Sequence, residues 1–160
     1  VGTRQSTILI VEDDVTALGL VSDLLRRSGY LVWQAGDLAG AMERLAAGTP
    51  SLVLLDIRLG TEDGLDVART LRADPDPETR SVPILALSAD AMQHDADRAL
   101  EAGCNGHLAK PAVARELLER IHALLEASTR PDQAPGTGDR RSQPRTGDRR
   151  SQPGAAAGGR

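Results

Sequence analysis

The chain has 160 residues, of which 40% are hydrophobic, and this length suits one folded domain with an appendage. Its single cysteine, Cys104, excludes an internal disulfide, and no apolar run approaches the roughly 20 residues of a membrane span, so we expect a soluble, cytoplasmic protein without a membrane partner. The net charge of −4 combines −8 over residues 1–129 with +4 over 130–160. An acidic body of this kind argues against nucleic-acid binding.

Short apolar runs alternate with segments of helical periodicity along most of the chain. The apolar runs predict strands at 8–11, 31–33, 52–55, 84–87 and 106–109. The periodic segments predict helices at about 15–28, 37–47, 64–72, 91–102 and 113–128. Five strand–helix units in strict alternation predict an α/β fold, a (βα)5 doubly wound parallel sheet between two layers of helices.

The composition divides the chain into three parts. Residues 7–128 form the predicted domain, preceded by a short extension over 1–6. Residues 129–160 contain the segment TGDRRSQP twice and show no apolar periodicity, so we interpret them as a disordered basic tail. The alternative is a peptide that docks on an acidic partner or on the acidic body of the chain itself.

Polar residues gather where the predicted strands end. Glu12, Asp13 and Asp14 follow the first strand, Asp56 ends the third, and the fourth and fifth lead to Ser88 and Lys110. Ligands of doubly wound sheets bind at this edge, and crowded carboxylates there favour Mg²⁺ or Mn²⁺. With a carboxylate nucleophile, a hydroxyl and an ammonium, the set is typical of phosphoryl transfer onto aspartate. For Asp14, a helix N-cap and a metal ligand are equally good interpretations.

Four motifs resemble the receiver domain of two-component response regulators: ILIVEDD at 8–14, LVLLDIRLGTEDG at 52–64, ILALSA at 84–89 and GHLAKP at 106–111. The resemblance implies a flavodoxin-like strand order of 2-1-3-4-5. It implies Asp56 as phosphoacceptor, Mg²⁺ held by Glu12, Asp13, Asp56 and the Arg58 backbone carbonyl, and phosphoryl contacts from Ser88, Ala89 and Lys110.

The chain departs from this family at two positions. Gly60 replaces a usual proline and should loosen the loop after the acceptor, and His107 replaces the usual aromatic partner of Ser88 in the switch. Arg58 and Asp90 stand at positions that flank the phosphoryl group in the family, and we expect them to pair over the site and tune the phosphoryl lifetime.

The resemblance implies a phosphohistidine donor, either a histidine kinase or a histidine phosphotransfer protein. A downstream protein would bind the face of the fourth helix, fifth strand and fifth helix. We expect no DNA-binding output domain and no enzyme activity beyond the domain's own phosphorylation and dephosphorylation. The initial Val in place of Met slightly favours a receiver excised from a hybrid kinase over a free-standing regulator.

Three alternatives fit less well. An aspartyl phosphohydrolase resembling the haloacid dehalogenases would need an acid where Arg58 stands. A receiver-like module that is not phosphorylated usually loses the acceptor or the acidic pair, and this chain keeps both. A nucleotide- or flavin-binding protein would need a glycine- or hydroxyl-rich loop after the first strand, where this chain is acidic.

Overall fold

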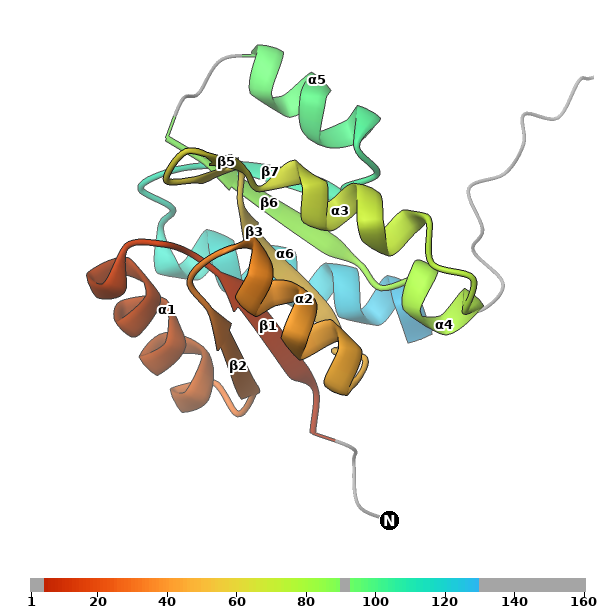
Figure 1. The fold of residues 1–160 in the computed structure, drawn as a ribbon. Coiled ribbons are helices and arrows are strands. Elements are labelled where there is room, and N and C mark those ends of the chain that lie inside the picture. The colour runs from red at the N-terminus through yellow and green to blue at the C-terminus, as the bar shows by residue number, and fades with distance from the viewer. Residues whose placement is uncertain (1–4, 90–92, 130–160) are drawn as a thin grey trace, which may run out of the picture.

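The computed structural model describes residues 5–89 and 93–129, which form a parallel sheet between two layers of helices (Figure 1). The sheet has the order β2-β1-β3-β6-β7, and all neighbouring strands are parallel. Its strands are β1 (Thr7–Val11), β2 (Leu31–Ala35), β3 (Leu52–Asp56), β6 (Ile84–Ser88) and β7 (Gly106–Ala109). Counting these five alone, the order is 2-1-3-4-5, which confirms the predicted fold class and topology.

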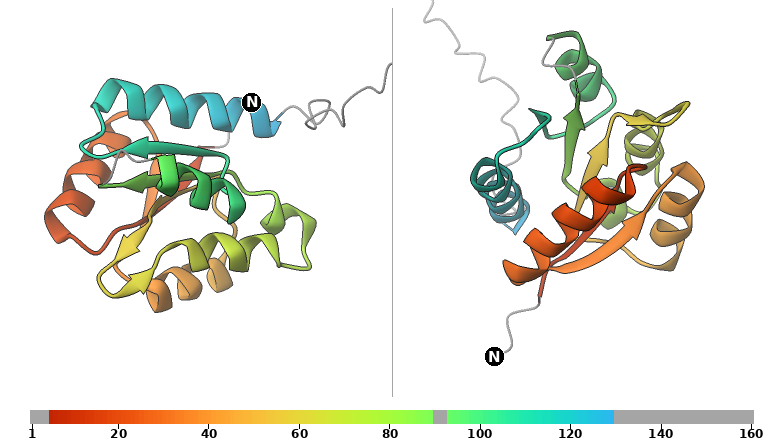
Figure 2. Two further views of the ribbon diagram at one scale, coloured as in Figure 1. Left: turned by 90° about the horizontal axis from the view of Figure 1, so that it is seen from above. Right: turned by 90° about the vertical axis from the view of Figure 1, so that its left-hand side faces the viewer.

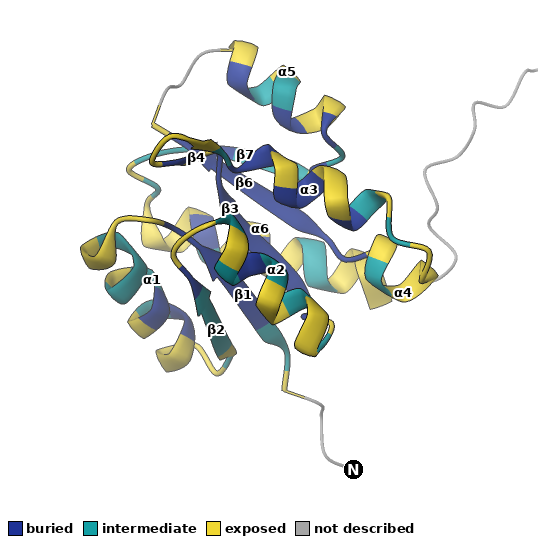
Figure 3. Ribbon diagram, in the orientation of Figure 1, coloured by how far each residue is buried: buried dark blue, intermediate teal, exposed yellow. Residues whose placement is uncertain are grey.

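Two helices cover one face of the sheet, and three shorter ones cover the other (Figure 2). The first face carries α1 (Val15–Arg27) and α6 (Ala114–Thr129). The second carries α2 (Leu38–Ala47), α3 (Leu65–Arg72) and α5 (Gln93–Glu101). Because both faces are covered, the central strands are apolar except at their terminal residues, and Figure 3 shows them as the buried centre of the molecule.

Alternate residues of each strand enter two separate cores. On β3, Val53 and Leu55 pack beneath α2, α3 and α5, whereas Leu52 and Leu54 pack beneath α1 and α6. This two-sided packing fixes the strand register, because a slip of one residue would exchange the two sets of side chains. The carboxyl ends of the strands are thereby held in fixed relative positions.

Three short elements were not predicted. A hairpin of β4 (Arg58–Leu59) and β5 (Glu62–Asp63) follows β3, and a helical turn, α4 (Pro77–Arg80), precedes β6. Two-residue strands carry no readable periodicity, whereas α4 has a signal that could have revealed it: Asp76 caps the turn, and Pro77 occupies its first position.

The predicted boundaries agree with the structure within a few residues. The last helix, α6, ends at Thr129, one residue beyond the predicted end of the domain. The basic tail from residue 130 lies outside the described residues, as does the predicted start of the fourth long helix at Ala91. Within the described part of the chain, no helix has both the length and the apolar character needed to cross a membrane.

Candidate functional site

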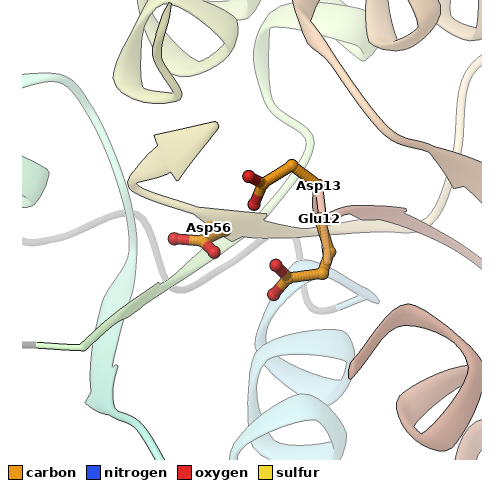
Figure 4. A group of neighbouring side chains, drawn as sticks. All are labelled: Glu12, Asp13 and Asp56. Atoms are coloured by element: carbon orange, nitrogen blue, oxygen red, sulfur yellow. The ribbon is translucent and has the colours of Figure 1, made fainter. Parts of the chain in front are cut away.

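Three carboxylates meet at the carboxyl ends of two adjacent strands (Figure 4). Val11 lies beside Leu55 in the register of β1 and β3, so the next residues, Glu12 and Asp56, emerge side by side. Oxygen atoms of Glu12, Asp13 and Asp56 lie within 4.8 Å of one another. Glu12 and Asp56 are 5% and 7% exposed, whereas Asp13 is open to solvent. The structure therefore brings the predicted acidic cluster together at a partly buried site.

Lys110 joins two of these carboxylates. Its ammonium donates to Glu12 Oε2 and, at 2.6 Å, to Asp56 Oδ2. Burial raises the pKa of Glu12, and the hydrogen bond from Lys110 only partly offsets that effect. Burial alone would lower the pKa of Lys110, but its hydrogen bonds with Asp56 and Glu12 prevail and leave that pKa raised. Lys110 therefore stays an ammonium at neutral pH.

The position of Lys110 follows from the pairing of β6 with β7. Ala109 lies beside Ser88 in that register, and the Lys110 N–H donates to the Ser88 carbonyl at 2.6 Å. The Lys110–Pro111 peptide bond is cis. The lysine side chain thus reaches the acids from the edge strand while its backbone continues the sheet.

The site fits a hard divalent cation. Three carboxylates face one ammonium, so negative charge exceeds positive charge within the cluster. Carboxylate oxygens at this density suit Mg²⁺ or Mn²⁺, and among the described residues no His or Cys, which would favour zinc, joins the cluster. Glu12, Asp13 and Asp56 are the residues that would hold the ion.

The backbone after Asp56 turns back beside the acids. The Arg58 N–H donates to Asp56 Oδ1 at 2.9 Å, and the Gly60 N–H donates to Asp13 Oδ2 at 3.0 Å. Gly60 has a φ of +62°, which glycine adopts without strain. At Gly64 a Cβ would lie 1.9 Å from the Asp56 carbonyl oxygen, so only glycine fits. The Gly60 N–H thus ties the loop after Asp56 to Asp13. Whether Gly60 loosens this loop relative to the usual proline stays a prediction.

Ser88 contacts His107. Ser88 ends β6 and is buried, and its Oγ lies 2.8 Å from His107 Nε2 on β7. The structure therefore places the two predicted switch residues in direct contact. Ala89, the next residue along, is exposed at the same edge.

Two other expectations concern the rim of the site. Asp14 accepts a hydrogen bond from the Ala17 N–H at 2.9 Å, so it is the N-cap of α1, the first of its two interpretations. The Arg58 side chain is exposed, and its predicted partner Asp90 lies outside the described residues. The roles of Arg58 as a carbonyl ligand and in lifetime tuning stay predictions.

The sequence did not reveal an ion-pair network behind the loop. Asp63 of β5 lies 3.2 Å from both Arg69 of α3 and Arg98 of α5. The Asp63–Arg98 pair spans 35 positions in sequence, and no spacing rule links such distant residues. It connects the loop after Asp56 to α5.

An apolar groove of about 570 Å³ opens beside the cluster. Glu12 and Lys110 form its polar end. The rest is lined by α1, by the end of β6 and the residue after it, and by α6 with the segment before it, among them Leu20, Leu24, Pro111 and Leu117. Leu20 is 68% exposed, so part of this apolar lining is open to solvent.

The parallel fold with acids at its carboxyl edge defines the class of receiver domains. The response regulator receiver domain family matches residues 8–122, and the chain belongs to this family. It is thus a receiver domain of two-component signalling.

Among curated relatives, the chain is 38% identical over 118 residues to protein PetR of Rhodobacter capsulatus. This match covers 74% of the chain and 48% of PetR, so the chain spans about half of that relative. It is 32% identical over 119 residues to the polar-differentiation response regulator DivK of Brucella anthropi, covering 74% of the chain and 95% of DivK. A crystal structure described as a response regulator from Chloroflexus aurantiacus is 32% identical, with a TM-score of 0.71 over 77% of the chain and 99% of that protein.

Proposed function

We propose that this receiver domain accepts a phosphoryl group on Asp56 from a phosphohistidine protein, with Mg²⁺ bound by Glu12, Asp13 and Asp56. The observation that carries the proposal is the contact of one ammonium, Lys110, with Asp56 and Glu12 inside the acidic cluster. A carboxylate that attacks phosphorus needs nearby positive charge, since the incoming phosphoryl oxygens repel it. Lys110 supplies part of this charge, and a divalent cation supplies the rest when bound.

The transfer balances as a displacement at phosphorus. An oxygen of Asp56 forms the new P–O bond while the P–N bond to the donor histidine breaks, and the electron pair of that bond returns to the imidazole. Lys110 then pairs with a phosphoryl oxygen, and Ser88 and the Ala89 backbone lie at the edge where that group would sit. The reaction acts only on the domain itself, so we do not assign it an enzyme activity on other substrates.

The phosphoryl donor and the downstream protein would bind two different surfaces. The apolar groove ends at Glu12 and Lys110, so a histidine kinase or phosphotransfer protein that seats an apolar surface there brings its phosphohistidine beside Asp56. The downstream protein would bind the face of α5, β7 and α6, which the Asp63–Arg98 pair links to the loop after Asp56. We place these exchanges in the cytoplasm, in keeping with the free, buried Cys104. The proposal includes no nucleic acid and no membrane.

The test is to incubate the protein with Mg²⁺ and acetyl phosphate and to weigh the intact chain by mass spectrometry. We expect a gain of one phosphoryl mass that is lost in Asp56→Asn and in EDTA. Asp66→Asn is the matched control, since Asp66 is an exposed acid outside the cluster.

The other outcomes separate the alternatives. Rapid consumption of acetyl phosphate that needs Asp56 but leaves no adduct would point to a hydrolase. Neither adduct nor consumption would leave a binding module and would overturn the proposed acceptor.

A further inference from the structure

The contact between Ser88 and His107 allows a proton to control the site. The Ser88 hydroxyl carries one proton, and its oxygen lies 2.8 Å from His107 Nε2. A neutral imidazole whose Nε2 lacks hydrogen accepts that proton, whereas an imidazolium can only donate from Nε2. An imidazolium therefore cannot compete with a phosphoryl group for the Ser88 proton, whereas a neutral His107 without hydrogen on Nε2 can.

The phosphoryl group needs the Ser88 proton. Its oxygens are acceptors, so a hydroxyl stabilises them only by donating to them. With His107 protonated, the bonds run in one direction, from Nε2–H to the Ser88 oxygen and from the Ser88 hydroxyl to the phosphoryl group. A charged donor at the start of such a chain strengthens it. With Nε2 as acceptor, Ser88 must first leave His107.

The geometry points to His107 as a proton-dependent positioning residue that stabilises a phosphoryl group on Asp56 more strongly at acidic than at alkaline pH. This inference rests on the proposed function and adds a regulation to it. His107 acts through Ser88 and is not itself placed against phosphorus.

The surroundings of His107 supply few competing charges. β6, which pairs with β7, carries no charged residue, and at the carboxyl edge Lys110 and Asp56 already pair with each other. Across the sheet face lies α5, whose buried Asp95 pairs with Arg98 at 3.6 Å. The remaining titratable groups of α5 in the described part of the chain are His94, Asp97 and Glu101.

The chain offers its own controls, because it has only three histidines. His94 is exposed on α5, and His122 is exposed on α6, where it lies 3.2 Å from Glu126. Neither contacts Ser88 through any bond that the structure gives. Glutamine in place of each histidine keeps hydrogen-bonding capacity but removes the titration.

The experiment measures the dissociation constant of beryllofluoride, a mimic of the phosphoryl group, by ¹⁹F NMR with saturating Mg²⁺ between pH 5.5 and 8. Each variant is compared with the wild type at the same pH, so the pH dependence of the probe cancels. For His107→Gln we expect binding about equal to wild type at pH 8 and roughly three- to tenfold weaker at pH 5.5, the size expected for one charge-assisted hydrogen bond. His94→Gln and His122→Gln should match wild type at every pH.

A Ser88→Ala background tests whether His107 acts through Ser88. There, His107→Gln should change beryllofluoride binding equally at all pH values. His107→Tyr restores the usual aromatic residue and should lack the tighter beryllofluoride binding of the wild type at acidic pH. This second variant is a control for a folding defect specific to His107→Gln. A constant ratio between His107→Gln and wild type across the range would overturn the inference alone. Beryllofluoride binding that is absent, or unaffected by Asp56→Asn, would overturn the proposed function as well.

Discussion

The amino and carboxyl ends of the strands both hold a half-buried cation, but they balance its charge differently. At the amino ends of β6 and β7, Arg72 donates to the carbonyls of Gly103, Arg80 and Val82 and to the side chain of Asn105, at 2.7–2.9 Å. All of these acceptors are neutral, and burial lowers the pKa of Arg72. At the carboxyl ends, Lys110 meets two members of a cluster of three acids.

The difference separates a structural cluster from a binding site. Carbonyl groups of the chain accept four hydrogen bonds from Arg72, which tie the end of α3 to the starts of β6 and β7. The acids around Lys110 carry more charge than the chain neutralises, which favours an added cation. Changes at the amino edge should therefore alter stability alone, whereas changes at the carboxyl edge should alter stability in a way that depends on Mg²⁺.

The largest effect should come from Arg72→Ala. It leaves the carbonyls of Gly103 and Val82, whose hydrogen bonds are part-buried, without this donor, so we expect the free energy of unfolding to fall by about 2–4 kcal/mol in urea titrations. Arg69→Ala is the control, because its partners Asp63 and Asp66 are partly exposed and such pairs contribute about 1 kcal/mol or less. If both variants lost the same free energy of unfolding, the hydrogen bonds of Arg72 would stabilise the fold no more than the exposed ion pairs of Arg69.

The second-largest effect on stability should come from adding Mg²⁺. At about 100 times its dissociation constant, it should raise the free energy of unfolding by about 2.7 kcal/mol over the value in EDTA. Differential scanning calorimetry would show the gain as a rise in Tm. Asp66→Asn should keep this gain, whereas the same Mg²⁺ concentration should stabilise Asp13→Asn less. An undiminished gain in Asp13→Asn would place the ion elsewhere.

A smaller effect concerns Cys104, which lies between the Arg72 partners Gly103 and Asn105. Burial raises the pKa of Cys104 from 9.0 to about 11. Stability from the protonated thiol is therefore complete below pH 9 and is lost as pH rises from 9 towards 11, because the unfolded chain releases the proton first. Between pH 8 and pH 10 the wild type should lose about 1.4 kcal/mol relative to Cys104→Ala. Parallel urea-titration profiles for the two proteins would contradict the burial of this thiol.

The smallest effect should be Asp13→Asn in EDTA. Asparagine keeps an oxygen for the Gly60 N–H but removes a charge from the cluster, so we expect a gain of roughly 0.5 kcal/mol in thermal unfolding. Asp23→Asn is the control, since Asp23 is an exposed acid on α1 that pairs with Arg26 at 3.9 Å. A loss of stability in Asp13→Asn without Mg²⁺ would mean that the like charges do not repel one another appreciably.

Features that depend on local pattern could be predicted from the sequence. The apolar run at 8–11 and the helix capped by Asp37 appear as predicted, since burial on both faces and capping follow from neighbouring residues. The grouping of Glu12 with Asp56 followed from parallel strands ending at one edge. The structure brings these acids together, while their roles in metal binding and phosphoryl transfer stay predictions.

Features that depend on contacts between distant residues could not be predicted. Arg72 reaches Asn105 across 33 positions, and Asp63 reaches Arg98 across 35. The structure was also needed to show that Asp14 is an N-cap, because in the sequence a carboxylate after a strand can be either a helix cap or a metal ligand. The hydrogen bond between Ser88 and His107 depends on the pairing of two strands and on side-chain rotamers. Neither can be read from a sequence motif.

Lys110 is the only lysine of the chain, and it is held between Glu12 and Asp56. Acetylation, ubiquitin transfer or an amine-reactive dye can therefore modify one lysine only, and the adduct removes the ammonium from the acidic cluster. Immobilising the protein through lysine would disable the site being studied, so a tag on a terminus is the safer attachment. The same property makes lysine acylation a selective chemical probe, because its rate reports how often Lys110 leaves its two carboxylate partners.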